Sequence, residues 1–159
     1  MRRHGIEASA AAVMLVLTAA GSAGSAEAAG MKRTVTMVAV EPKGGAAVDK
    51  EPFPSAALPE GKGYALKRPD ASGRWEVSTY RWEPSQIVVN QGDEVTLEIL
   101  GVNGAEHPST LDGYDINFTV KRGELTTVTF TADKAGVFRF RCGIHQPSMT
   151  GELIVLPAR

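Results

Sequence analysis

The sequence predicts an all-β protein, a sandwich or barrel of short strands, on three observations. Runs of β-branched and aromatic residues recur along the chain and are separated by turn residues. No segment after residue 29 shows the sustained 3.6-residue apolar period of an amphipathic helix. The 159 residues are 43% hydrophobic and 22% charged, which indicates one ordinary folded domain and excludes a disordered polymer or a multi-span membrane protein.

Residues 1–28 have the pattern of a secretory signal peptide. Arg2 and Arg3 begin it, an uncharged stretch follows with its apolar centre at residues 13–17, and residues 26–28 (Ala-Glu-Ala) suit a signal peptidase. The apolar centre is too short for the ~20 residues of a membrane span. We therefore expect cleavage after Ala28, a periplasmic or otherwise exported protein, and no stable membrane insertion after cleavage.

The remaining chain divides into an N-terminal part, residues 29–74, and a β domain, residues 75–159. Thr34–Val40 is a predicted strand, whereas Glu41–Gly73 carries five of the nine prolines and is expected to be a long irregular extension. This extension could support an oligomer. The further predicted strands are Trp75–Trp82, Gln86–Asn90, Val95–Leu100, Ile116–Val120, Leu125–Thr131, Val137–Cys142 and Glu152–Leu156.

Charge and cysteine content exclude several functions. The net charge is -1, without the basic excess that a nucleic-acid-binding protein uses to hold phosphates. The single cysteine, Cys142, excludes an intramolecular disulfide and any metal site that needs two thiolates. A free thiol in an exported protein is a liability unless something protects or uses it.

A cluster of soft metal ligands lies near the C-terminus. Cys142, His145 and Met149 fall within eight residues, on one loop between two predicted strands. Thiolate and thioether select copper, imidazole suits it, and a trigonal Cys-His-His site with a weak axial Met is the blue-copper arrangement. The second histidine must then be His107, the only other one after residue 28, expected in the loop after Val95–Leu100. A metal-free protein, with a buried Cys and Met and a structural His, remains the alternative.

The stretch from about residue 83 to residue 157 resembles the cupredoxin family. The matching motifs are residues 84–95 (PSQIVVNQGDEV), 130–136 (FTADKAG), 138–142 (FRFRC) and 149–155 (MTGELIV). The Cys-to-His spacing is similar to that of plastocyanin and amicyanin. The middle portion also resembles the copper domain of cytochrome c oxidase subunit II and nitrosocyanin, a red copper protein. The resemblance implies a Greek-key β-sandwich and one Cu(I)/Cu(II) ion held by His107, Cys142, His145 and Met149.

Departures from these relatives refine the expected site. The binuclear copper site of the oxidase needs two cysteines, and this chain has one. Nitrosocyanin uses a second loop histidine and a glutamate, whereas this loop has Met149 and no second histidine. Glu106, beside His107, keeps a carboxylate-ligated site open as an alternative. In the family the residue after the upstream histidine commonly donates its N–H to the thiolate, and Pro108 has none. We therefore predict a lower reduction potential than in a relative with that donor.

The expected function is outer-sphere electron transfer with redox protein partners that the sequence does not identify, and an electron carrier is favoured over an enzyme. By resemblance, the electron leaves through the edge of His145. Two alternatives place copper at the same site. One is a copper carrier that delivers the ion to an oxidase or reductase. The other is a small copper enzyme in which Met149 does not bind and Glu106 or water takes the open position.

Overall fold

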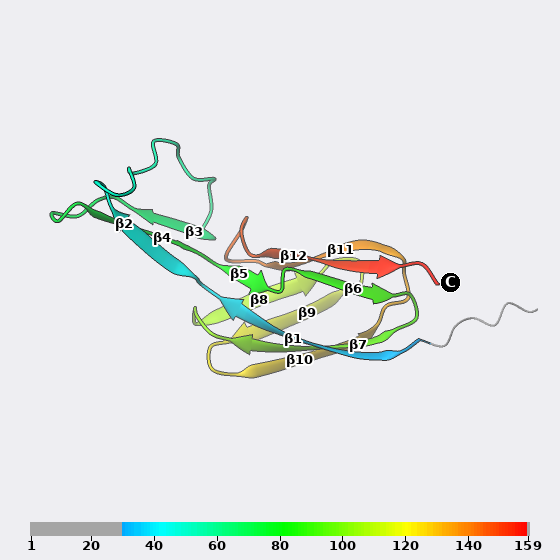
Figure 1. The fold of residues 1–159 in the computed structure, drawn as a ribbon. Helices are drawn as coiled ribbons and strands as arrows, with labels where there is room; N and C mark the ends of the chain where they lie inside the picture. Colours follow the sequence, from blue (N-terminus) through cyan, green and yellow to red (C-terminus); the bar gives the residue numbers. More distant parts are fainter. Residues whose placement is uncertain (1–29, 159) are drawn as a thin grey trace, which may run out of the picture.

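Two β-sheets face each other in the computed structural model, which describes residues 30–158 (Figure 1). The first sheet has the order β10 (Leu125–Thr131), β7 (Glu94–Gly101), β1 (Lys32–Val40), β5 (Arg81–Glu83). The second has the order β6 (Gln86–Asn90), β12 (Thr150–Leu156), β11 (Gly136–Cys142), β8 (Glu106–Leu111), β9 (Ile116–Lys121). The prediction of an all-β sandwich is confirmed. The predicted signal peptide lies outside the described residues.

Side chains that alternate along the strands fill the space between the two sheets. β7 buries every second residue, among them Val95, Leu97 and Ile99, and β12 does the same with Leu153 and Val155. This period of two is what a sheet with one covered face requires. Within residues 30–158 no helix is long and apolar enough to cross a bilayer.

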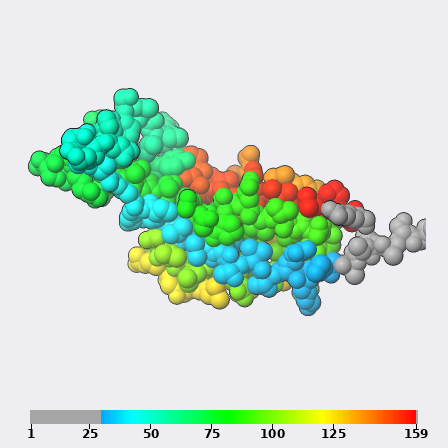
Figure 2. Space-filling view, viewed as in Figure 1, coloured from blue at the N-terminus to red at the C-terminus, as the bar shows by residue number. Residues whose placement is uncertain are grey.

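A third sheet projects from one end of the sandwich, with the order β2 (Lys43–Ala47), β4 (Arg74–Thr79), β3 (Tyr64–Lys67). It belongs to residues 41–80, which we call the insert because they lie between β1 and β5. Figure 2 shows the insert as a lobe at one end of the molecule. The expectation that Glu41–Gly73 is irregular throughout is therefore wrong. The prolines that suggested it lie outside β2 and β3, so both strands can pair with β4.

Three further boundaries differ from the sequence-based expectation. The predicted strand Trp75–Trp82 is two strands, β4 and β5, interrupted at Tyr80, and they belong to different sheets. β1 pairs with both β7 and β5, so the N-terminal strand is part of the sandwich and the division at residue 75 does not follow the sheets. His107 lies in strand β8 rather than in a loop.

Candidate metal centre

His107 and Cys142 reach the site from two neighbouring strands of the five-stranded sheet. His107 is the second residue of β8, and Cys142 is the last residue of β11. The register pairs Cys142 with Ser109, two residues after His107, so both side chains lie on the inner face at the same end of the sandwich. Both side chains are 0% exposed.

Pro108 explains why the strand around His107 escapes detection in the sequence, since proline is uncommon inside a sheet. β11 pairs with β8 only from Ser109 to Leu111, so at Pro108 the ladder on that side has ended. The Pro108 carbonyl accepts a hydrogen bond from Gly143 N–H at 2.8 Å. The N and C=O of one strand residue point to the same side, so the missing N–H of Pro108 faces the chain that follows Cys142.

Residues 143–149, which we call the ligand loop, bring His145 and Met149 back to Cys142. Cys142 N–H donates to the Met149 carbonyl at 3.0 Å, and Met149 N–H donates to the His145 carbonyl at 3.0 Å. The Gln146 amide donates to the Cys142 and Met149 carbonyls at 2.7 and 3.1 Å. Thr150 Oγ1 donates to Gln146 Oε1 at 3.0 Å. These bonds hold the loop closed on itself.

The three strongest candidate ligands converge on one point. His107 Nδ1 lies 3.1 Å from His145 Nδ1, and Cys142 Sγ lies 3.8 Å from the first and 3.4 Å from the second. A circle through the three atoms has a radius of about 2.0 Å, which matches the ~2.0–2.3 Å bonds of first-row metals to imidazole and thiolate. The chemistry of this donor set, two imidazoles and one thiolate, suits copper.

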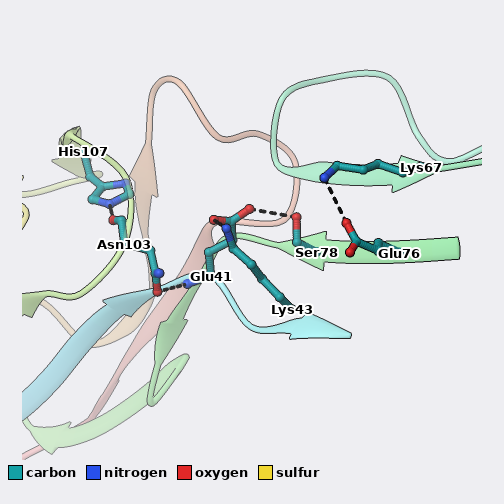
Figure 3. A network of polar contacts seen from close by, with 7 residues as sticks. All are labelled: Glu41, Lys43, Lys67, Glu76, Ser78, Asn103 and His107. Atoms are coloured by element: carbon teal, nitrogen blue, oxygen red, sulfur yellow. Dashed lines mark hydrogen bonds and ion pairs between the residues drawn. The ribbon is translucent and has the colours of Figure 1, made fainter. Parts of the chain in front are cut away.

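A hydrogen bond outside this triangle fixes which nitrogen of His107 can bind a metal. His107 Nε2 lies 2.7 Å from the Asn103 carbonyl oxygen, which can only accept, so Nε2 carries the proton and Nδ1 has a free lone pair (Figure 3). The Asn103 side chain in turn accepts from Glu41 N–H at 2.9 Å. This contact ties the His107 support to the start of the insert.

His145 is held neutral by its surroundings. Burial, together with the neighbouring His107, lowers the pKa of His145 below its ordinary value. A neutral imidazole keeps the lone pair that a metal ligand needs. His145 is only half-buried, whereas His107 and Cys142 are fully buried.

The two candidates for an axial ligand differ in where they lie. The Met149 side chain is fully buried in the core, and its carbonyl oxygen accepts a hydrogen bond from the Cys142 N–H. Glu106 is exposed, and as the neighbour of His107 on β8 it points to the opposite face of the sheet. The group of clustered ligand atoms comprises those of His107, Cys142 and His145, and Glu106 is not part of it.

Besides Asn103, residues that contact the histidines and that sequence reasoning missed include Tyr80 and Gly104. Tyr80 stacks on the His145 ring, with centroids 3.8 Å apart and planes at 24°. Gly104 has a φ of 74°, and a Cβ there would lie 2.9 Å from His107 Cε1. A glycine in a turn before a strand gives no sign that an imidazole occupies its side-chain space. Tyr80 is separated from His145 by more than sixty residues, so no local motif links them.

The sequence of this chain is similar to one protein family and to several known proteins. The pattern of the family described as cupredoxin-like domain matches residues 64–155. Nitrous-oxide reductase of Ralstonia nicotianae is 31% identical over 96 residues, which are 58% of this chain and 14% of that protein. Cytochrome c oxidase subunit 2 of Thermus thermophilus is 30% identical over 80 residues, 48% of this chain and 58% of that protein. The chain thus spans less than two thirds of either relative.

Solved structures share the fold. A copper nitrite reductase from Nitrosomonas europaea superposes with a TM-score of 0.50 at 21% identity, over 79% of this chain and 42% of that one. A multi-copper oxidase from Pseudomonas thermotolerans gives a TM-score of 0.51 at 14% identity, over 81% of this chain and 30% of that one. The family match covers more than half of the chain, the fold agrees with it, and three ligand atoms meet at a point that fits copper. The chain belongs to the cupredoxin-like domain family, and its cofactor is copper.

Proposed function

We propose that this protein is an exported electron carrier that holds one copper ion through His107, Cys142 and His145, with Met149 as the axial ligand. The observation that carries the proposal is the triangle of two Nδ1 atoms and one Sγ, and the buried Met149 at the end of the same loop is the candidate fourth ligand. Bound there, copper supplies one-electron chemistry by alternating between Cu(I) and Cu(II).

The protein's part is to keep the ligands where they are in both oxidation states. Strands β8 and β11 fix His107 and Cys142, and the Gln146 hydrogen bonds fix the ligand loop. The buried imidazole and thiolate are shielded from water, which favours electron transfer over ligand exchange. Electrons pass to and from a redox partner through the half-buried His145, beside Ile144, which is 39% exposed.

A copper enzyme is the second candidate, because nitrous-oxide reductase and copper nitrite reductase are among the similar proteins. Such an enzyme needs a coordination position open to substrate. The exposed position of Glu106, on the opposite face of β8, favours the buried Met149 as fourth ligand and a site without an open position.

The decisive experiment is Cu(II) titration of the mature protein followed by visible absorption. An intense blue-copper band should appear, disappear in Cys142→Ser, and stay unchanged in Glu106→Gln. Addition of azide should leave the band unchanged, and a small outer-sphere oxidant should oxidise the Cu(I) form rapidly and reversibly. A red or yellow protein whose spectrum responds to azide or to Glu106→Gln would support the enzyme instead. Absence of a charge-transfer band at full copper occupancy would remove Cys142 from the site.

Export has its own test. Expression of the full chain in a double-membrane bacterium should give a periplasmic protein whose N-terminal residue is Ala29. A cytoplasmic protein that still begins at residue 1 would contradict export without affecting the copper site.

A further inference from the structure

Hydrogen bonds at Gly63 join the insert to the ligand loop. Gly63 N–H donates to the Gln146 carbonyl at 3.0 Å, and Ser148 Oγ donates to the Gly63 carbonyl at 2.8 Å. The same Gly63 carbonyl accepts from Tyr80 N–H at 2.9 Å. Gly63 therefore links the ligand loop to the residue that ends the insert.

The contact leaves no room for a side chain. A Cβ at Gly63 would overlap Ser148 Oγ and lie 2.6 Å from the His145 carbonyl oxygen. A Cβ at Gly61, whose φ is 130°, would overlap the Gln146 carbonyl oxygen. Real Cβ atoms do not approach other atoms so closely, so this fit exists only because both positions are glycine.

Tyr80 is the part of the insert that reaches the copper ligands. Its ring is stacked on His145, and its centroid lies 5.7 Å from that of His107. Tyr80 stands between β4 and β5, so the sheets on either side of it fix its backbone. The stack covers one face of the His145 ring, which is half-buried, whereas the His107 ring is fully buried.

This placement bears on how copper leaves the site. His107 and Cys142 are fully buried, so His145 is the ligand that can turn away first and expose the ion to a competing ligand. For the His145 ring to rotate out of the site, its stack with Tyr80 must break. That stack, in turn, is held by the hydrogen bond from Tyr80 to Gly63.

We propose that the insert is a copper-retaining cap, with Tyr80 as the positioning residue that clamps His145. The cap slows dissociation of copper without contributing a ligand. The proposal rests on copper binding and not on electron transfer, so either can fail alone. It also separates this protein from a copper-delivery protein, in which the exposed ligand would have to be free to exchange.

The first test measures release of Cu(I) from the mature protein to an excess of a coloured Cu(I) chelator. Tyr80→Ala should release copper faster by about two- to tenfold, the range that corresponds to one aromatic pair. Tyr80→Phe keeps the ring and should release at the rate of the native protein. The visible spectrum of Cu(II)-loaded Tyr80→Ala should stay close to that of the native protein, because all ligands are retained.

A matched pair of glycine variants tests the cap without altering Tyr80. Gly63→Ala should lift the insert from the ligand loop and speed release as Tyr80→Ala does. Gly44→Ala lies in the same insert, where the nearest atom to the added Cβ is Val77 Cγ1 at 3.9 Å, and it should have no effect. Denaturant unfolding of each copper-free variant shows whether the sandwich itself is intact.

Equal release rates in the native protein, Tyr80→Ala and Gly63→Ala would overturn the proposal. Faster release from Tyr80→Phe, equal to that from Tyr80→Ala, would show that the hydroxyl rather than the stack matters, and would also overturn it. If Tyr80→Ala does not fold, the comparison of Gly63→Ala with Gly44→Ala decides. A native protein that retains copper through the cap but shows no blue band would refute the proposed electron-transfer site and leave the cap standing.

Discussion

Replacing Met149 by leucine separates the two roles that this residue can have, core packing and axial ligation. The side chain is 0% exposed and belongs to the hydrophobic core. Met and Leu have similar volumes, so Met149→Leu should cost less than about 1.5 kcal/mol of unfolding free energy in the copper-free protein. Met149→Ala would instead leave a cavity and cost about 2–5 kcal/mol.

The effect on copper follows from the lost thioether. A fourth, axial donor adds electron density to the copper and stabilises the more highly charged Cu(II) relative to a three-coordinate site, so its removal should raise the reduction potential. An axial bond that stabilises Cu(II) by about 1.4 kcal/mol more than Cu(I) lowers the potential of a one-electron couple by about 59 mV. We therefore expect Met149→Leu to raise the potential by an amount on the order of 60 mV while the fold stays intact.

Two measurements on the same variant decide the matter. Denaturant unfolding of the copper-free protein gives the packing effect, and redox titration of the copper protein gives the ligand effect. A native-like potential and spectrum in a stable Met149→Leu protein would show that Met149 is a core residue only. The axial position would then have to be assigned to another group.

Three further predictions follow from local contacts. Pro108→Asn introduces an N–H on the side of β8 that faces the chain after Cys142, where it could donate to the thiolate, so redox titration should show a higher potential, and no change or a fall would contradict this. Gly104→Ala should weaken copper binding at least tenfold in a competition titration, because its Cβ would lie 3.0 Å from His107 Nε2; Gly123→Ala has a similar φ and open space, and should bind copper normally. The backbone N–H groups of Asn90 and Met31 and the Arg33 guanidinium donate to the Asp93 carboxylate and lower its pKa. The stability that these hydrogen bonds give to the fold is therefore present at neutral pH and is lost as the pH falls below about 3.8 through the folded-state pKa. Asp93→Asn should flatten that acid dependence, and unfolding curves with the same pH profile as the native protein would refute the assignment.

Several strands and the candidate ligands could be predicted from the sequence because their signals are local. Gln86–Asn90 and Leu125–Thr131 coincide with β6 and β10, since alternating β-formers between turn residues leave little choice. The sequence also brought His107, Cys142 and His145 into one hypothesis, and the fold places their ligand atoms together. Their role as copper ligands, and that of Met149, stays a prediction until a spectrum is measured.

The parts that escaped prediction depend on tertiary partners. β2 contains Gly44 and Gly45 and has little β-propensity of its own, and it forms because β4 offers a ladder beside it. β8 contains a proline that only the early end of β11 makes acceptable. The stack of Tyr80 on His145 requires the whole sandwich to bring the two together.

The position of the insert between β1 and β5 means that its length can change without altering the sandwich. β1 and β5 are antiparallel neighbours, and their last pair joins Val40 to Arg81. The insert thus takes the place of the turn in a β1–β5 hairpin. A turn of about two to five residues could join the same two strands. None of the proposed copper ligands lies in the insert, so shortening it would remove none of them. The copper ligands and the insert that sets the rate of copper release therefore lie in separate stretches of chain. Each stretch can be changed by mutation while the other is kept.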